Sequence, residues 1–440
     1  MINKVLRYSG LLVFAFLASI HGFSQRYLAD FDSLLFVRDT LRPVLKRFEN
    51  LRITGYIQPQ FQVAESKGAG SYNGGDFAPY SNNRFMLRRA RVKIDYFLAT
   101  DDHYPKALFT FQVDATERAI GLRDMFVKIY EAKKNNFSMT AGMFARPFGY
   151  EVNLSSTFRE APERGRMSQI LMPSERDLGA MVTYEPLRRE AKNKLIKLDA
   201  GVFNGQGLSG RTDFDSYKDF ISRLTLKPVK RGPWNISGGL SLLYGGWRNG
   251  SKYEYEISSL PNGEKYFKVD STPSNLGGKA PRRYYGADMQ TVYKHGWGET
   301  EIRAEYWAGR QPGTATTTVN PGDTPALNGV PLPTYKRNFD GAFFLFLQNI
   351  INKKNQLIVK YDWYDPNTDV AGDDLGKGGT NLTPADIKFS TLGLGFLHHI
   401  NDNIKLVFYY DIVKNETTQL AGYTKDLKDN IFTTRIHFRF

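Results

Sequence analysis

Hydrophobic and polar residues alternate with a period of two along most of the chain after residue 51. Residues 89–97 show this most clearly, with apolar side chains on one face and charged side chains on the other. The apolar face carries Ala90, Val92, Ile94 and Tyr96, and the charged face carries Arg89, Arg91, Lys93 and Asp95. Because successive side chains of a strand point to opposite sides, the pattern predicts an antiparallel sheet with one wet face. A soluble β-sandwich would show the same alternation.

The lengths of the connections favour a closed barrel over a sandwich. We predict sixteen strands, at about residues 51–63, 84–98, 106–114, 122–133, 136–144, 178–186, 194–203, 218–228, 233–244, 283–294, 298–308, 338–349, 354–364, 387–399, 402–413 and 429–440. The connections then alternate strictly between long and short. Short turns at one end and long loops at the other are typical of outer-membrane barrels. The expected fold class is therefore all-β, a transmembrane antiparallel β-barrel of about 16 strands.

The last predicted strand adds support for a membrane barrel. Its lipid-facing set would be Phe432, Thr434, Ile436, Phe438 and Phe440, and its other set Thr433, Arg435, His437 and Arg439. A terminal strand that ends on an aromatic residue resembles the assembly signal of bacterial outer-membrane proteins. An even number of strands also brings both chain ends to the short-turn end, as export and membrane assembly require.

The amino terminus has the pattern of a targeting segment. Lys4 and Arg7 precede an apolar run at residues 11–20, and the small residues Gly22 and Ser24 follow it. This layout predicts a signal peptide at residues 1–24, followed by an N-terminal periplasmic segment at 25–50 and the barrel domain at 51–440. No apolar run reaches the roughly 18 residues that a transmembrane helix needs. The absence of cysteine excludes disulfides as a source of stability.

The formal net charge of +14 could indicate a nucleic acid, an acidic membrane surface or an anionic solute as partner. Nucleic-acid binding would require contiguous basic patches with exposed aromatic side chains. Here the basic residues alternate one by one with lipid-facing groups, which places the charge inside a tube. The predicted lumen lining is Arg89, Arg91, Lys93, Lys128, Arg223, Arg303, Lys360, Lys405, Arg435 and Arg439.

Residues 144–180 form the longest interruption of the alternation in the first half of the chain. The segment contains five arginines and four glutamates but no lysine, although lysine is common elsewhere. The planar fork of arginine grips carboxylate or phosphate at two points, whereas lysine acts as a point charge. We therefore predict a loop folded into the barrel, whose substrate-binding residues are Arg146, Arg159, Arg164, Arg166 and Arg176. The alternative is a surface loop whose arginines and glutamates pair with each other.

Three segments resemble the phosphate-selective porin O and P family: RFMLRRARVKIDY (84–96), GMFARPFGYE (142–151) and SERDLGAMV (174–182). Members of that family are sixteen-stranded outer-membrane porins, typically trimers, with an arginine-lined anion pathway and a third loop that folds inward. The arginine segment is the third long connection of this chain. The resemblance therefore implies a homotrimer in outer-membrane lipid that conducts small inorganic anions such as phosphate or polyphosphate.

Other motifs carry less weight. Gly205, Gly207 and Gly210 match a dinucleotide fingerprint, but a strand pattern follows them where a helix is needed. Oxygen ligands gather at residues 365–374, yet Val370 stands where a calcium loop needs glycine. His398 and His399 point to opposite faces of one strand. We predict neither a metal site nor a cofactor.

We expect a passive outer-membrane diffusion channel selective for anions, and not an enzyme. Two alternatives stay open. One is an outer-membrane barrel enzyme of the lipase kind, for which no spacing of Ser, His and Asp singles out a catalytic triad. The other is a non-conducting structural or adhesin barrel.

Overall fold

The computed structural model describes residues 50–99, 104–187, 193–210 and 213–440. The chain divides into two compact units, Met1–Arg52 and Ile53–Phe440, and the second unit is the barrel. The predicted signal peptide and nearly all of the predicted periplasmic segment lie outside the described residues. Both stay predictions.

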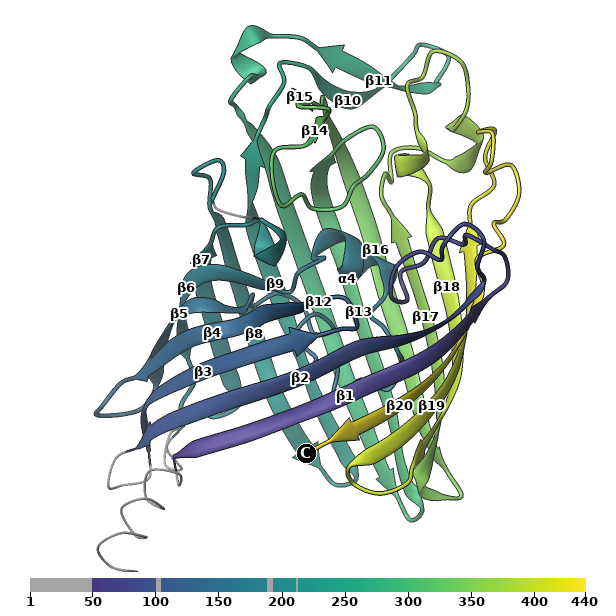
Figure 1. Cartoon of the computed structure of the whole chain (residues 1–440). Helices are drawn as coiled ribbons and strands as arrows, with labels where there is room; N and C mark the ends of the chain where they lie inside the picture. The colour runs from purple at the N-terminus through teal and green to yellow at the C-terminus, as the bar shows by residue number, and fades with distance from the viewer. Residues whose placement is uncertain (1–49, 100–103, 188–192, 211–212) are drawn as a thin grey trace, which may run out of the picture. The chain divides into compact units, whose positions relative to one another are not determined.

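Sixteen antiparallel strands form one closed wall, as the alternation predicts (Figure 1). They are β1 (Leu51–Ala64), β2 (Asn83–Ala99), β3 (Pro105–Ala115), β4 (Ile120–Tyr130), β5 (Phe137–Ala145), β6 (Arg176–Tyr184), β7 (Ile196–Phe203), β8 (Asp219–Arg231), β9 (Trp234–Arg248), β12 (Lys279–His295), β13 (Gly298–Gly313), β16 (Thr334–Ile350), β17 (Asn352–Asp365), β18 (Phe389–His399), β19 (Ile404–Asn415) and β20 (Ile431–Arg439). The wall closes where β20 pairs with β1, with Tyr56 opposite Arg439. Closure leaves no strand edge, which matters because the bilayer core offers no water to unpaired backbone groups.

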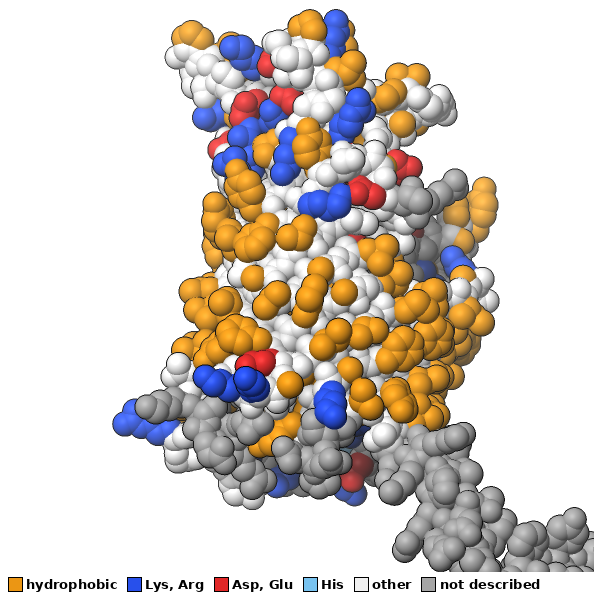
Figure 2. Space-filling model, turned by 90° about the vertical axis from the view of Figure 1, so that its left-hand side faces the viewer, with side chains coloured by type: hydrophobic (Ala, Val, Ile, Leu, Met, Phe, Trp, Pro, Cys, Tyr) orange, Lys and Arg blue, Asp and Glu red, His pale blue; other side chains and the backbone are white. Residues whose placement is uncertain are grey.

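The outer surface of the wall is apolar. Val127 and Ile129 of β4 are 42% and 58% exposed, because they point away from the lumen. On the face shown in Figure 2, hydrophobic side chains cover the middle of the wall, and charged side chains lie toward its two ends. Trp234 and Tyr293 pack at 4.7 Å close to the short turns. Aromatic residues at that level suit the membrane–water interface.

Two details of the predicted connections are wrong. The connection between β3 and β4 is only residues 116–119, because Gly121 and Leu122 continue the pairing with β3. Long and short connections therefore do not alternate strictly. The long connection after β9, to which no strand was assigned, contains a hairpin of β10 (Glu254–Ser259) and β11 (Lys265–Asp270). β10 pairs in parallel with β16, so the hairpin extends the sheet at the long-loop end.

The remaining elements are short. They are α4 (Arg166–Leu171), η2 (Gly207–Ser209), η3 (Pro273–Asn275), η4 (Gly372–Asp374), η5 (Pro384–Asp386) and the hairpin of β14 (Ala326–Leu327) and β15 (Val330–Pro331). No helix in the described part of the chain is long and apolar enough to cross a bilayer.

Candidate functional site: the inner loop and the lumen wall

The connection between β5 and β6, residues 146–175, folds into the barrel, and we call it the inner loop. Its helix α4 lies at mid-height within the ring of strands in Figure 1. Side chains and backbone of the loop bond to strands that are not neighbours in the wall, for example Glu151 to Lys360 of β17 and Ser156 to Tyr56 of β1. The predicted inward-folded third loop is therefore present.

The loop enters the lumen through a turn that requires glycine. Gly149 has a φ of +69°, in the left-handed region that side chains disfavour. A Cβ at this position would also lie 2.3 Å from Oε1 of Glu305. That carboxylate accepts the backbone N–H groups of Tyr150 and Glu151, each at 2.8 Å. The close approach lets one side chain of β13 hold the first turn of the loop.

Glu163 at the tip of the loop pairs with three arginines. Its carboxylate lies 2.9 Å from Arg88, 2.6 Å from Arg89 and 2.8 Å from Arg435. Burial alone would raise the pKa of this carboxyl, but the three arginines hold it well below its usual range. Glu163 is therefore ionised, and its charge is shared among three guanidinium groups.

Two more glutamates of the loop bond to the wall. Glu151 pairs with Lys360 at 2.6 Å and accepts the hydroxyl of Ser168 at 2.6 Å. Glu160 lies 2.7 Å from Arg303, which also pairs with Glu301 at 2.6 Å. Charged pairs therefore fix the loop at several points around the lumen.

Apolar packing also fixes the inner loop to the wall. The loop contributes Phe148, Val152, Met167, Ile170, Leu171 and Met172 to a buried cluster, and inward-facing wall residues contribute Phe144, Phe203, Ile221, Leu243, Tyr284, Trp307, Phe339 and Tyr364. Phe148 meets the Trp307 ring edge-on at 4.7 Å. Each fully buried large apolar side chain stabilises the fold by roughly 1.5–3 kcal/mol. The loop is thus a packed element and part of the lumen is filled.

The five predicted loop arginines have different surroundings. Arg164 and Arg176 pair with Glu175, at 3.6 and 2.9 Å, and Arg176 is the first residue of β6. Arg166 stacks on Phe389 at 3.8 Å. Arg146 and Arg159 are buried and form no ion pair with a described residue, and Nε and Nη1 of both have no hydrogen-bond partner among the described residues.

All ten predicted lumen residues lie on the inner face of the wall, buried or half-buried. Seven form ion pairs with carboxylates: Arg89, Arg91, Lys93, Arg223, Arg303, Lys360 and Arg435. Within the described part of the chain, Lys128, Lys405 and Arg439 have no carboxylate partner at ion-pair distance. Much of the positive charge of the lumen is therefore neutralised locally.

Sequence reasoning missed the carboxylates that do this. Asp288 pairs with Arg223 at 2.6 Å, and Asp114 pairs with Arg91 at 2.8 Å. Asp114 does lie on the polar face of its alternating strand, so a count of acidic as well as basic inner positions could have found it. Arg88 was not predicted as an inner residue, because strict alternation allows only one of two neighbouring residues to point inward and Arg89 was assigned that direction.

Oxygen-bearing side chains of residues 365–374 bond within the protein. Asn367 donates to Asp386 at 2.7 Å, and Asp374 pairs with Lys377 at 3.0 Å. Among the described residues no group of three His, Asp or Glu side chains is arranged to hold a metal ion.

No protein-family model matches the chain, and no curated protein matches it either. Solved structures are similar in fold. OprB of Pseudomonas putida has a TM-score of 0.56 at 10% identity, over 92% of this chain and 97% of that one. An anion-selective porin from Comamonas acidovorans has 0.52 at 10%, over 89% and 99%. The outer membrane channel DcaP of Acinetobacter baumannii has 0.50 at 12%, over 89% and 97%.

At these identities the likeness concerns the fold. The fold is that of the outer-membrane porins, a closed sixteen-stranded barrel with an apolar outer surface. A closed barrel with an apolar outer surface is the form in which strands cross a lipid bilayer.

Proposed function

We propose that this protein is a passive diffusion channel that prefers anions. The observation that carries the proposal is that Arg159, at the centre of the inner loop, is buried and has unused hydrogen-bond donors. Its side chain is 7% exposed, and Nε and Nη1 have no hydrogen-bond partner among the described residues. One N–H of its Nη2 donates to the carbonyl of Leu154 at 3.1 Å. A buried cation with spare donors favours an anion that passes close to it.

Lys405 extends this positive region toward the short-turn end. Its ammonium donates to the carbonyls of Thr157 and Arg159, at 3.0 and 2.9 Å. No described carboxylate pairs with it, so its charge is not cancelled as the charges of seven other lumen residues are. Two neighbouring uncancelled cations make the lumen attractive to anions beside the loop.

Phosphate or polyphosphate is the proposed substrate class. The motifs that resemble phosphate-selective porins support it, and so does the two-point fork of arginine at the loop. We also propose a homotrimer, on that resemblance alone. Small inorganic anions and outer-membrane lipid are then the expected partners, and nucleic acid is not.

A planar-bilayer recording in unequal KCl tests the proposal. The reversal potential should take the sign of chloride permeation, and added phosphate should reduce the chloride current. A reversal potential of the cation sign would contradict it. Such a result would show that lumen carboxylates such as Glu299, Glu301 and Glu305 control permeation.

A non-conducting structural barrel is the second candidate, and the apolar cluster around Phe148 and Trp307 favours it. Packing of this density closes the part of the lumen that it occupies. The same bilayer recording decides, because a sealed barrel would insert without conductance. A lipase-like activity has no comparable support, since no described serine is hydrogen-bonded to a histidine; a phospholipid hydrolysis assay tests it directly.

A further inference from the structure

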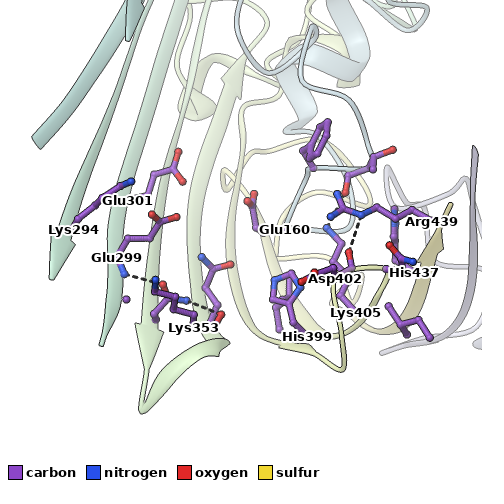
Figure 3. Close-up of a pocket in the computed structure, with 18 of the residues that line it drawn as sticks. Glu160, Lys294, Glu299, Glu301, Lys353, His399, Asp402, Lys405, His437 and Arg439 are labelled. Atoms are coloured by element: carbon purple, nitrogen blue, oxygen red, sulfur yellow. Dashed lines mark hydrogen bonds between the residues drawn. The ribbon is translucent and has the colours of Figure 1, made fainter. Parts of the chain in front are cut away.

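A cavity of about 450 Å³ lies beneath the inner loop at the short-turn end of the barrel (Figure 3). Thr157, Phe158 and Glu160 of the loop form its roof, and the short-turn ends of the strands form its sides. Its volume is within the range of small-molecule sites. Short turns face the periplasm in outer-membrane barrels, so the cavity is a vestibule on that side.

His437 of β20 lines this cavity and has an unused hydrogen-bond donor. Arg89 donates to Oε1 of Gln58 at 3.3 Å, which identifies Nε2 as the amide nitrogen of Gln58. That nitrogen donates to the carbonyl of Ser156 at 3.0 Å and to Nδ1 of His437 at 2.8 Å. Nδ1 of His437 is thus an acceptor, and in the neutral ring the proton is on Nε2.

Nε2 of His437 has no partner among the described residues, although the side chain is only 1% exposed. The ring is held in place by stacking on Tyr56, at a centroid distance of 5.3 Å. A buried N–H group without an acceptor costs about 1–3 kcal/mol. A ligand oxygen in the cavity would remove that cost.

The wall around His437 carries two basic side chains, with the exposed Asp402 also on this side. Lys405 and Arg439 lie beside it in Figure 3. Lys405 uses two of its three N–H donors on loop carbonyls, and Arg439 donates from Nε to the carbonyl of Asp402 at 2.9 Å. Neither forms an ion pair with a described carboxylate. Together with His437 they offer a carboxylate several donors from one side.

The opposite wall is negative. Glu299 and Glu301 of β13 lie across the cavity from His437 in Figure 3. Glu299 has no ion pair among the described residues, and Glu301 shares Arg303 with Glu160, two carboxylates for one guanidinium. Lys294 and Lys353 also line this side, but both are exposed at the rim, where water and salt screen them. An inorganic anion would therefore meet unfavourable carboxylates here.

We propose that this vestibule binds small zwitterionic solutes of the amino-acid or short-peptide class. The carboxylate of the solute lies against His437, Lys405 and Arg439, and its ammonium group lies against Glu299 and Glu301. The volume accommodates a dipeptide. This site shares Lys405 with the positive region of the inner loop, but its other contacts, His437, Arg439, Glu299 and Glu301, lie in the vestibule.

Calorimetric titration of the detergent-solubilised protein with dialanine tests the site. Two blocked analogues are the matched probes: N-acetyl-dialanine lacks the ammonium group, and dialanine amide lacks the carboxylate. We expect dialanine to bind at least tenfold more tightly than either analogue. Absence of dialanine binding would overturn the proposal. Equal binding of N-acetyl-dialanine would overturn it too, because the cavity would then be a plain anion site.

Substitutions in the cavity wall test whether dialanine binds at this site. Glu299→Gln should weaken dialanine at least tenfold without weakening N-acetyl-dialanine, whereas Lys405→Met should weaken both. Lys268→Gln and Glu264→Gln, in the hairpin at the opposite end of the barrel, are charge-matched controls that should change neither. A shift in gel mobility on boiling verifies that each variant is folded. Because the side chain of Glu299 bonds to no described residue, an unchanged affinity in folded Glu299→Gln would refute the site. The titration measures binding and not ion current, so its result does not depend on whether the channel prefers anions.

Discussion

Oε1 of Glu163 lies 2.8 Å from Nη2 of Arg435, so a carboxylate of the inner loop is bonded to the last strand of the barrel. The same carboxylate pairs with Arg88 and Arg89 of β2. Because β1 lies between β20 and β2, a single side chain connects β20 to β2 across β1, at the place where the barrel closes. The same ion pairs therefore fix the position of the inner loop and connect the strands at which the wall closes.

Replacing Glu163 by Gln should destabilise the barrel. The change leaves three largely buried arginines without their shared counter-charge, and breaking a buried ion pair from one side typically costs about 3–5 kcal/mol. We expect the temperature at which the folded band disappears from unboiled gels to fall by several degrees or more. Glu264→Gln, at an exposed turn, is the matched control. An unchanged transition would show that the arginines find other partners.

Arg159 should determine the block of chloride current by phosphate. Arg159→Lys retains the charge but loses the two-point fork, so it should weaken phosphate block and largely preserve chloride preference. Arg159→Ala should reduce both, and Arg231→Ala, at the exposed end of β8, should reduce neither. Identical behaviour of the Lys and Arg proteins would make the site a plain positive charge.

The same substitutions at Arg164 and Arg166 extend the test along the loop. We predict that each alanine variant weakens phosphate block less than Arg159→Ala does, because Arg164 is near Glu175 and Arg166 is stacked on Phe389. If Ala at all three positions leaves both conductance and block unchanged, the inner loop is not the constriction.

Gly149→Ala should disturb the inner loop more than a comparable change elsewhere. Gly75 is the matched control, since its φ of +93° is also positive but a Cβ there would meet nothing within 4 Å. Both variants carry the backbone cost of about 1–2 kcal/mol. Only Gly149→Ala adds the clash with Glu305. Limited proteolysis should therefore cut the loop in the Gly149 variant alone, and equal resistance of the two variants would be inconsistent with the tight turn.

The purified protein should behave as a membrane barrel. We expect extraction only by detergent, circular dichroism dominated by β structure, and a shift in gel mobility on boiling. Recovery of a soluble monomer from the periplasm without detergent would contradict this expectation.

The sequence alone determined the wall of the barrel and the direction in which its side chains point. A strand repeats every two residues, so the inward direction of Arg435 and the outward direction of Ile436 can be read from local order. The hairpin of β10 and β11 was not predicted, because it pairs outside the membrane, where no lipid imposes an apolar face. The length and arginine content of the inner loop also indicated correctly that it folds inward.

Only the tertiary structure decided which charges cancel. Glu151 and Lys360 are 209 positions apart, and nothing in the local pattern of either residue indicates the other. The same holds for the apolar contact of Phe148 with Trp307. It also holds for the hydrogen bond from Gln58 to Nδ1 of His437, which leaves the ring proton on Nε2. These contacts depend on how a loop lies inside a closed wall, and closure brings together residues whose separation along the chain carries no information about their distance in space.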